Sequence, residues 1–461
     1  MNEPSGAGSR SEVLIVGAGV CGLTLAYQLG KQGRRVTVLE REPVVGGLAR
    51  SFRYPEGSFD VGPHRFHTHN QRIRDLILEV LGDDALTIPR LSMVHFRGHY
   101  YRWPIHPSVH LLRFPLPIML GIAFDLVFRL YRRHPPRTFR EYVLNMYGKT
   151  LYREFFRDYS EKFLGITPEE TDADWAKTGI DRAIIDERLK INTLWELLRS
   201  IFVRPSDVET KFVYARGGTG GYCDKLRVLI ERKGGRVLTG RAVTGLETED
   251  GRIRAMMCGD ERHEADRFVW TAPITLLADR IGVDLADAPG PGLRYLDIVF
   301  FNIVTKSRCG PDFQWCYFGE KGISFNRVSR PEDFDPGIFA RGHGLCVEVS
   351  APMGRDVWQN QDELLPRITS DLIRVGLLRS PGDVEAVHIE RVPECYPIYE
   401  AGYRARLKWV RERLGRFANL TTAGRTGMYW YNNMDHSIGL AMKLAKDDLA
   451  TVPPGEDPQT V

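Results

Sequence analysis

The apolar positions near the N-terminus follow the pattern of a strand, a helix and a second strand. Val13–Val16 form a short apolar run, and apolar residues then recur at helical spacing between positions 23 and 29. A second run, Arg35–Leu39, is rich in β-branched residues and ends at Glu40. The pattern therefore predicts a β-α-β unit at the start of the chain.

Further along, the patterns typical of helices and strands alternate in long blocks. Residues 106–205 are mostly helical in pattern, residues 236–271 and 289–397 are rich in strand-like runs, and helices are expected at 225–233, 404–414 and 437–450. We therefore expect an α/β protein whose two domains are each assembled from separate segments. The first domain is expected at 11–95, 210–288 and 405–450, the second at 96–209 and 289–404, and flexible tails at 1–10 and 451–461.

Three glycines of the first β-α-β unit indicate what kind of ligand it binds. Gly17 allows a tight turn after the strand, Gly19 lets the backbone approach a pyrophosphate, and Gly22 lets helix and strand pack closely. The helix N-terminus then offers unpaired N–H groups to phosphates, and Glu40 is placed to bind a ribose hydroxyl. This arrangement predicts a dinucleotide site that also includes Ala18 and Cys21.

A second diglycine turn follows Glu40 directly. The segment that continues from Arg41 to Gly46, Gly47, Leu48, Ala49 and Arg50 resembles the glutathione-reductase-like FAD enzymes, and among them the amine oxidase and protoporphyrinogen oxidase branch. The resemblance implies a bound FAD in a glutathione-reductase-like Rossmann domain, with a discontinuous mixed α+β substrate domain. It also implies that Tyr214–Gly221 returns the chain to the FAD domain and that a backbone group around Val243 contacts the adenine.

The C-terminal part of the chain repeats the phosphate-binding pattern. Gly424 and Arg425 follow an expected strand and precede a loop and a helix. In the resembled enzymes this segment closes the flavin site, which implies that Met434 and Ser437 also contact the cofactor. The positive end of the helix dipole would there stabilise an anionic reduced flavin.

Three stretches resemble the UDP-galactopyranose mutase family more closely. These are Gly62–Thr68, Leu151–Gly165 and Gly424–Tyr431. The resemblance implies catalytic roles for His64, Arg425 and Tyr431, and substrate contacts from Arg65, Tyr159, Tyr429, Tyr431 and Asn433.

Two departures from the mutase pattern leave the chemistry open. The mutase tryptophan beside the nucleotide base is Leu164 here, and the mutase aspartate before the methionine is Asn433. We therefore expect an FAD-dependent oxidoreductase that acts on a nucleotide- or polyprenyl-linked sugar in cell-surface polysaccharide biosynthesis. The alternatives are a redox-neutral sugar-nucleotide mutase and a protoporphyrinogen-oxidase-like dehydrogenase. A protein whose flavin is only structural is a further alternative, which the Arg, His, Tyr and Trp residues of the predicted flavin loops disfavour.

Composition and charge exclude several other classes. The net charge of +4 over 461 residues is too small to indicate nucleic-acid binding. The seven cysteines form no C-x-x-C pair and no cluster with histidine, which indicates free thiols in a reducing cytoplasm and predicts no metal site. A small-molecule substrate is the expected partner, and Arg65, Arg102, Arg153 and Arg157 favour one with a diphosphate over a porphyrinogen.

One apolar stretch allows two interpretations. Phe114–Phe128 is too short and too interrupted to span a bilayer, which takes ~20 apolar residues. Arg129, Arg132, Arg133, Arg137 and Arg140 follow it, so the stretch could lie on an anionic membrane surface. The simpler interpretation, which the sequence favours because no long amphipathic period is sustained, is a helix of the substrate domain with a solvated basic edge.

Overall fold

A five-stranded parallel sheet contains the predicted β-α-β unit. The computed structural model describes residues 12–103, 115–128, 134–179, 211–351 and 356–450. In sheet order the strands are β19 (Leu420–Thr422), β13 (Arg267–Trp270), β1 (Glu12–Val16), β2 (Arg35–Leu39) and β9 (Arg236–Leu238). Because β1 lies in the centre and is buried on both faces, it forms a nearly continuous apolar run.

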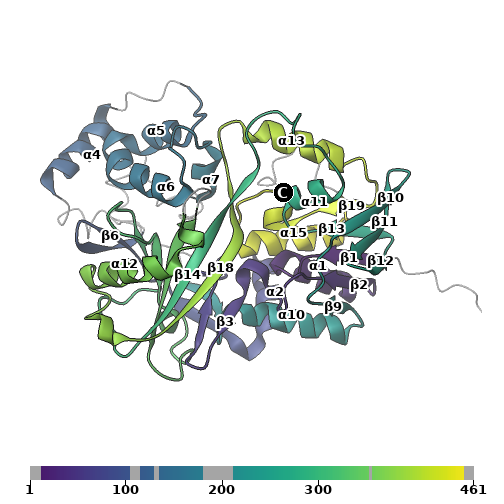
Figure 1. Cartoon of the computed structure of the whole chain (residues 1–461), viewed down its shortest axis with the longest axis horizontal. Helices are drawn as coiled ribbons and strands as arrows, with labels where there is room; N and C mark the ends of the chain where they lie inside the picture. The colour runs from purple at the N-terminus through teal and green to yellow at the C-terminus, as the bar shows by residue number, and fades with distance from the viewer. Residues whose placement is uncertain (1–11, 104–114, 129–133, 180–210, 352–355, 451–461) are drawn as a thin grey trace, which may run out of the picture.

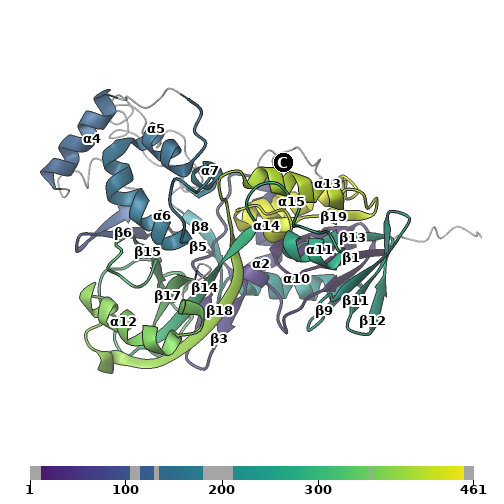
Figure 2. The same ribbon diagram turned by 45° about the horizontal axis from the view of Figure 1, so that its top comes forward.

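Helices pack beside this sheet in an arrangement that Figures 1 and 2 show from two sides. They are α1 (Val20–Lys31), α2 (Gln71–Leu81), α10 (Gly220–Arg232) and α15 (Met434–Lys446), and α1 contacts both α10 and α15. A small antiparallel sheet of β10 (Gly245–Glu249), β11 (Arg252–Cys258) and β12 (Glu261–Glu264) lies at the far edge. Helix α11 (Ile274–Arg280) follows β13.

The second part of the molecule is built on a seven-stranded mixed sheet. Its order is β18 (Val384–Ile398), β14 (Arg294–Thr305), β17 (His343–Ala351), β16 (Arg327–Ser329), β15 (Trp315–Phe318), β6 (Ser92–Phe96) and β7 (His99–Trp103). Strands β14 and β18 are long and pair along most of their length, reaching from this sheet toward the parallel sheet.

Most of the remaining helices lie around the seven-stranded sheet. They are α4 (Leu116–Phe128), α5 (Phe139–Leu151), α6 (Arg157–Leu164), α7 (Asp174–Gly179) and α12 (Gln361–Arg374), and a π-helical turn at Tyr152–Phe156 joins α5 to α6. Helix α13 (Tyr403–Leu414) leads the chain back to the parallel sheet. No helix within the described ranges is both long and apolar enough to cross a bilayer.

A buried carboxylate joins segments that are far apart in the sequence. Asp60, at the end of β4 (Ser58–Asp60), accepts hydrogen bonds from Ser51 in β3 (Ser51–Arg53), from Tyr214 in β8 (Lys211–Ala215), and from Thr219. Strand β8 also pairs with β5 (Ala85–Pro89). These bonds fix the second diglycine segment against the start of α10, and burial raises the pKa of the Asp60 carboxyl.

The predicted α/β class is confirmed, and so is the parallel sheet of a Rossmann-like domain. The strand at Arg35–Leu39 was predicted with its observed bounds, whereas α15 begins at Met434, three residues before the predicted start at Ser437. Strand β6, which begins at Ser92, belongs to the seven-stranded sheet, although the first domain was expected to extend to residue 95. The expected tails lie outside the described residues.

Candidate functional site

A cavity of about 460 Å³ opens between the two sheets. Its wall includes the ends of β1, β2 and β13, the first residues of α15, and parts of β16 and β18 from the other sheet. Ligands of open parallel sheets bind at the carboxyl ends of the strands, and this cavity lies at that edge.

The glycine turn after β1 shapes one wall of the cavity. Gly17 has a φ of +100°, and a Cβ atom on Gly22 would lie 2.0 Å from the Gly17 carbonyl oxygen, so helix and strand touch directly. A Cβ atom on Gly19 would meet no atom within 4 Å, although Gly19 lines the cavity. The space in front of Gly19 is therefore open to a ligand, as a pyrophosphate cradle requires.

Backbone hydrogen bonds fix the orientation of Glu40 at the end of β2. Its Oε2 accepts from the Ala18 N–H at 2.7 Å and its Oε1 accepts from the Glu42 N–H at 2.9 Å. The Gly46 N–H donates to the Ala18 carbonyl oxygen at 2.8 Å, which joins the two glycine turns. The carboxylate is thus held rigidly on the cavity wall, where a ribose hydroxyl could donate to it.

Most of the predicted cofactor-binding residues line this one cavity. They are Gly17, Gly19, Cys21, Glu40, Arg41, Gly46, Gly47, Leu48, Ala49, Arg50, Val243, Gly424, Arg425, Met434 and Ser437. Ala18 and Gly22 do not line it but stand behind the turn, where they hold its shape. Burial raises the pKa of the Cys21 thiol to about 12, so this cysteine is a neutral packing residue.

The C-terminal segment forms another part of the wall, next to the glycine turn. Helix α14 (Gly424–Gly427) follows β19, and Gly424 has a φ of +77° that brings its backbone within reach of Cys21. Helix α15 begins at Met434 with Asn433 as its N-cap residue, and both residues line the cavity. The positive end of α15 therefore faces the cavity, where it favours an anionic group.

Three arginines converge at the part of the cavity that the second sheet closes. We call Arg65, Arg327 and Arg425 the arginine cluster, and all three line the cavity. Arg327 is paired with Glu348, but Arg65 and Arg425 form no ion pair within the described part of the chain. Burial, together with the neighbouring Arg90, lowers the pKa of Arg65 to about 10. This unbalanced positive charge predicts an anionic ligand.

His64 lies beside the arginine cluster and is held neutral. Burial lowers its pKa to about 3, and the charges of Arg425 and Arg327 contribute to the shift. Its Nδ1 atom is buried without a hydrogen-bond partner. A neutral imidazole cannot act as an acid at neutral pH, so His64 can accept or position a hydrogen bond there but cannot supply a charge.

Aromatic rings surround the cluster. The Arg425 guanidinium lies 4.4 Å from the Tyr396 ring centroid and 4.8 Å from that of Tyr431. Tyr317, which also lines the cavity, contacts Tyr159 edge to face at 6.0 Å between ring centroids. Tyr159 itself is not among the lining residues, so the structure places it behind Tyr317.

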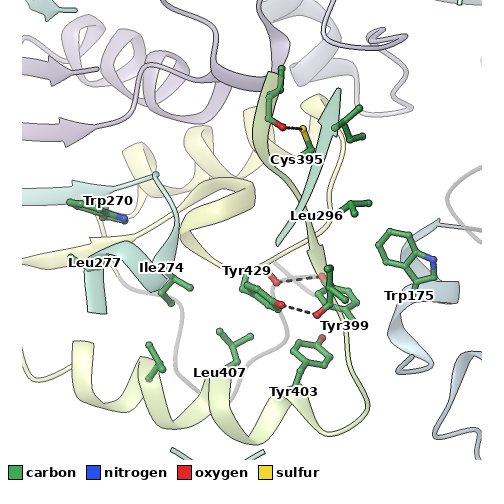
Figure 3. Packing of buried hydrophobic residues seen from close by; sticks show 14 of the residues in the cluster. Trp175, Trp270, Ile274, Leu277, Leu296, Cys395, Tyr399, Tyr403, Leu407 and Tyr429 are labelled. Atoms are coloured by element: carbon green, nitrogen blue, oxygen red, sulfur yellow. Dashed lines mark hydrogen bonds between the residues drawn. The ribbon is translucent and has the colours of Figure 1, made fainter. Parts of the chain in front are cut away.

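Tyr429 lies in the hydrophobic core, away from the cavity lining. Figure 3 shows its ring among buried residues, and its hydroxyl lies 2.7 Å from the carbonyl oxygens of both Arg294 and Ile398. The backbone of Tyr429 has a φ of +52°, in the left-handed region, whereas Tyr431 in the same loop lines the cavity. The predicted substrate contact of Tyr429 is therefore corrected: this tyrosine holds the loop to β14 and β18.

Other predicted arginines are spread over the surface. Arg102, Arg153 and Arg157 are exposed and do not line the cavity, so they were wrongly placed at the cleft. Arg327 was not predicted. A signal was present in β17, where Glu348 is a single charged residue inside an apolar run and stands opposite Arg327 in the strand register. A buried carboxylate of this kind needs a cationic partner.

The described ranges hold no cluster of metal-ligating side chains. They contain no group of three or more His, Cys, Asp or Glu side chains arranged to hold an ion. All seven cysteines are free thiols.

Known protein families and curated proteins share parts of this sequence. The sequence model of the flavin containing amine oxidoreductases matches residues 20–426. A probable UDP-galactopyranose mutase from Klebsiella pneumoniae is 30% identical over 172 residues, which is 36% of this chain and 44% of that protein. A dTDP-fucopyranose mutase from Escherichia coli is 26% identical over 35% of this chain and 44% of its own length. The chain thus aligns with less than half of these curated relatives.

Solved structures resemble the chain over nearly its whole length. A reduced UDP-galactopyranose mutase superposes with a TM-score of 0.80 at 22% identity, covering 96% of each chain. A protoporphyrinogen oxidase candidate from Exiguobacterium sp. 255-15 superposes with a TM-score of 0.75 at 18% identity, covering 96% of this chain and 99% of that one. At these identities the likeness establishes the fold.

Proposed function

The chain belongs to the flavin containing amine oxidoreductase family, and we propose that it is an FAD enzyme acting on a sugar that carries a diphosphate. The FAD follows from the family and fits the residues present, because the open space before Gly19, the oriented Glu40 and the N-terminus of α15 suit its pyrophosphate, ribose and ring. When bound, flavin supplies either a hydride acceptor or, in its reduced form, a nucleophilic N5.

The observation that carries the substrate proposal is the arginine cluster. Two of its members, Arg65 and Arg425, have buried Nε atoms without hydrogen-bond partners, and neither is paired with a described carboxylate. A diphosphate offers several anionic oxygens that could accept from these guanidinium groups. A porphyrinogen would instead require a wide apolar slot with few charges, which does not fit this wall of the cavity.

Among sugar diphosphates, we favour a redox-neutral mutase reaction on a nucleoside diphosphate sugar. In this reaction the bond between the anomeric carbon and the diphosphate oxygen breaks, and the electron pair leaves with the diphosphate. When bound in its reduced form, flavin would supply the electron pair that replaces this bond at the anomeric carbon. The old ring C–O bond would then open, the ring would close through a different hydroxyl, and a diphosphate oxygen would finally re-form its bond to the anomeric carbon. Throughout, the arginine cluster would hold the diphosphate and stabilise its developing charge. No net oxidation of the sugar occurs, so the reaction needs no external electron acceptor. The named mutases among the relatives support this choice.

The assay is product analysis with dithionite-reduced enzyme. Incubation with UDP-galactopyranose or dTDP-fucopyranose under anaerobic conditions should yield the furanose isomer, and the oxidised enzyme should yield much less. Conversion of neither sugar nucleotide, with FAD bound, would contradict the mutase proposal.

The arginine cluster can be tested separately by ligand binding. Titration of UDP against flavin fluorescence should show that Arg65→Met and Arg425→Met each weaken binding by about ten- to a hundredfold, since hydrogen bonds to charged groups contribute about 1.5–3 kcal/mol. Arg254→Met is the matched control, because Arg254 is exposed and pairs only with Glu249 on the distant small sheet. If Arg65→Met and Arg425→Met bind UDP as tightly as Arg254→Met does, the arginine cluster does not bind a diphosphate.

A second candidate is oxidation of a sugar C–H bond by the oxidised flavin. Leu164 favours it, because this residue is buried in the core and offers no aromatic surface to a nucleotide base. The two reactions differ in one readout: a substrate that is oxidised bleaches the flavin absorbance anaerobically, whereas a mutase substrate leaves the oxidised spectrum unchanged. Nucleotide-linked and polyprenyl-linked sugars share the diphosphate, so both belong in the substrate screen.

A further inference from the structure

Helix α4 carries an apolar face that is largely exposed. Leu116, Leu120, Phe124 and Val127 recur at helical spacing, and each exposes between 58% and 65% of its surface. Only two other large hydrophobic side chains in the described ranges are comparably exposed, Val44 and Val228, and they stand singly. An exposed apolar stripe of this kind indicates an interaction surface.

The opposite face of α4 is firmly attached to the protein. Ile118 is buried, and it packs in a small core with Phe96 and Tyr101 of the β6–β7 hairpin. Asp125, the one charged residue of the helix, accepts a hydrogen bond from the Thr150 N–H at 2.6 Å. The outward stripe therefore carries no charge, and the helix is fixed in the orientation that exposes it.

The position of α4 in the molecule is peripheral. Figures 1 and 2 both place it at the outer end of the second part of the protein, away from the parallel sheet. Among the described elements, α4 therefore stands at the edge of the molecule.

The charge of the segments that flank α4 in the sequence indicates which kind of partner surface the stripe fits. Residues 97–157 contain eleven Arg and Lys but only three Asp and Glu, whereas the whole chain has a net charge of only +4. Among the described residues, Arg97 and Arg102 are exposed on the hairpin that packs on α4, and Arg137 and Arg140 are exposed at the start of α5, which also contacts α4. An apolar stripe on a helix whose neighbouring elements carry exposed arginines is complementary to a bilayer with anionic head groups. The stripe would enter the interface and the arginines would contact the lipid phosphates.

We propose that α4 docks the protein on the surface of an anionic phospholipid bilayer. The helix lies in the interface through Leu116, Leu120, Phe124 and Val127 and does not cross the membrane, for which its 13 residues are too short. This inference is independent of the proposed function, because it uses no residue of the cavity.

The experiment is flotation of the FAD-loaded full chain with vesicles. Vesicles of phosphatidylcholine alone are compared with vesicles containing equal amounts of phosphatidylcholine and phosphatidylglycerol. We expect binding to the anionic vesicles that weakens as salt is raised, and at least a tenfold loss of bound protein in the variant Leu120→Ser/Phe124→Ser. Val228→Ser on α10 is the matched control, since Val228 is also exposed but lies on another helix, and it should bind as the unchanged protein does.

Two readouts keep the test decisive. Flavin absorbance and the thermal midpoint should be the same in all variants, because the substituted side chains are exposed. Insertion is measured with Phe124→Trp, whose added fluorescence should be quenched by brominated lipids, whereas that of Val228→Trp should not. Absence of binding to anionic vesicles, or equal binding by the double variant, overturns the proposal. A stable dimer in solution that the double variant dissociates, with no vesicle binding, would show instead that a second copy covers the stripe.

Discussion

Arg327 and Glu348 form a two-point ion pair inside the protein, with 2.7 Å from Nε to Oε1 and 2.6 Å from Nη2 to Oε2. They stand opposite each other on β16 and β17, and Glu348 is almost completely buried. The charge of Glu348 raises the pKa of the Arg327 guanidinium. The pair thus fixes one member of the arginine cluster in a single orientation at the cavity wall.

This pairing predicts that substitutions can separate the structural role of Arg327 from its role in ligand binding. Arg327→Met should destabilise the protein by about 3–5 kcal/mol, because it leaves a buried carboxylate without a partner. The double variant Arg327→Met/Glu348→Leu should recover most of that stability but should still bind UDP weakly. Urea unfolding and UDP titration measure the two effects. Recovery of UDP binding in the double variant would show that Arg327 has only a structural role.

A side chain at Gly19 should remove the cofactor without unfolding the protein. The backbone of Gly19, with φ −76° and ψ −179°, accepts any residue, and the new side chain would enter the open part of the cavity. Gly19→Val should therefore yield a colourless protein with the far-UV spectrum of the unchanged chain. Gly245→Val is the control, because the nearest atom to a Cβ there is 4.0 Å away and the site lies outside the cavity. A yellow Gly19→Val protein would contradict the proposed pyrophosphate position.

His64 should make the cofactor-free protein sensitive to acid. Its folded pKa of about 3 is below its ordinary value of 6.5, so the unfolded chain binds a proton that the folded chain does not. The stability is thus fully present above pH 6.5 and is lost as the pH falls toward 3, by at most about 2 kcal/mol at pH 5. Urea unfolding at pH 7 and pH 5 should show a smaller loss for His64→Gln than for the unchanged protein. Equal losses would mean that His64 is not desolvated.

Tyr429 and Tyr431 should respond to substitution in opposite ways. Tyr429→Phe removes a buried hydroxyl from two carbonyl oxygens and should cost about 1–3 kcal/mol of stability, with UDP affinity unchanged. Tyr431→Leu removes a ring that the Arg425 guanidinium approaches to 4.8 Å, and should weaken UDP binding about tenfold with less effect on stability. Thermal unfolding and UDP titration distinguish the two, and the reverse outcome would place Tyr429 at the ligand.

The first β-α-β unit was predictable because its signals are local. Strand period, helix period and the glycines of the turn all fall within 29 residues, from Glu12 to Glu40, and each indicates the same structure. The start of α15 was harder to predict, since Asp435 and His436 make its first turn look like a polar loop. There the N-cap position of Asn433 was the usable signal.

The arginine cluster was only partly predictable because it is assembled from distant segments. Arg65 and Arg425 stood in recognisable motifs, whereas Arg327 reaches the cavity through the pairing of β16 with β17. The lone Glu348 in β17 indicates that a cation lies opposite it but does not identify which one. Tyr429 was misplaced for a related reason. It shares a short loop with Tyr431, and the spacing of the two tyrosines does not indicate that one enters the core while the other lines the cavity.

The central place of β1 in its sheet has a consequence for how the protein is made. Strand β1 pairs at once with β2, but its other neighbour is β13, and Glu12 and Asp266 at this edge are 254 residues apart. At a synthesis rate of 5–20 residues per second, an emerging chain waits roughly 13–50 s for that partner. One edge of the apolar strand β1 is unpaired throughout this time, so the nascent chain needs protection from aggregation. The FAD site is complete only once β19 and α15 have also left the ribosome.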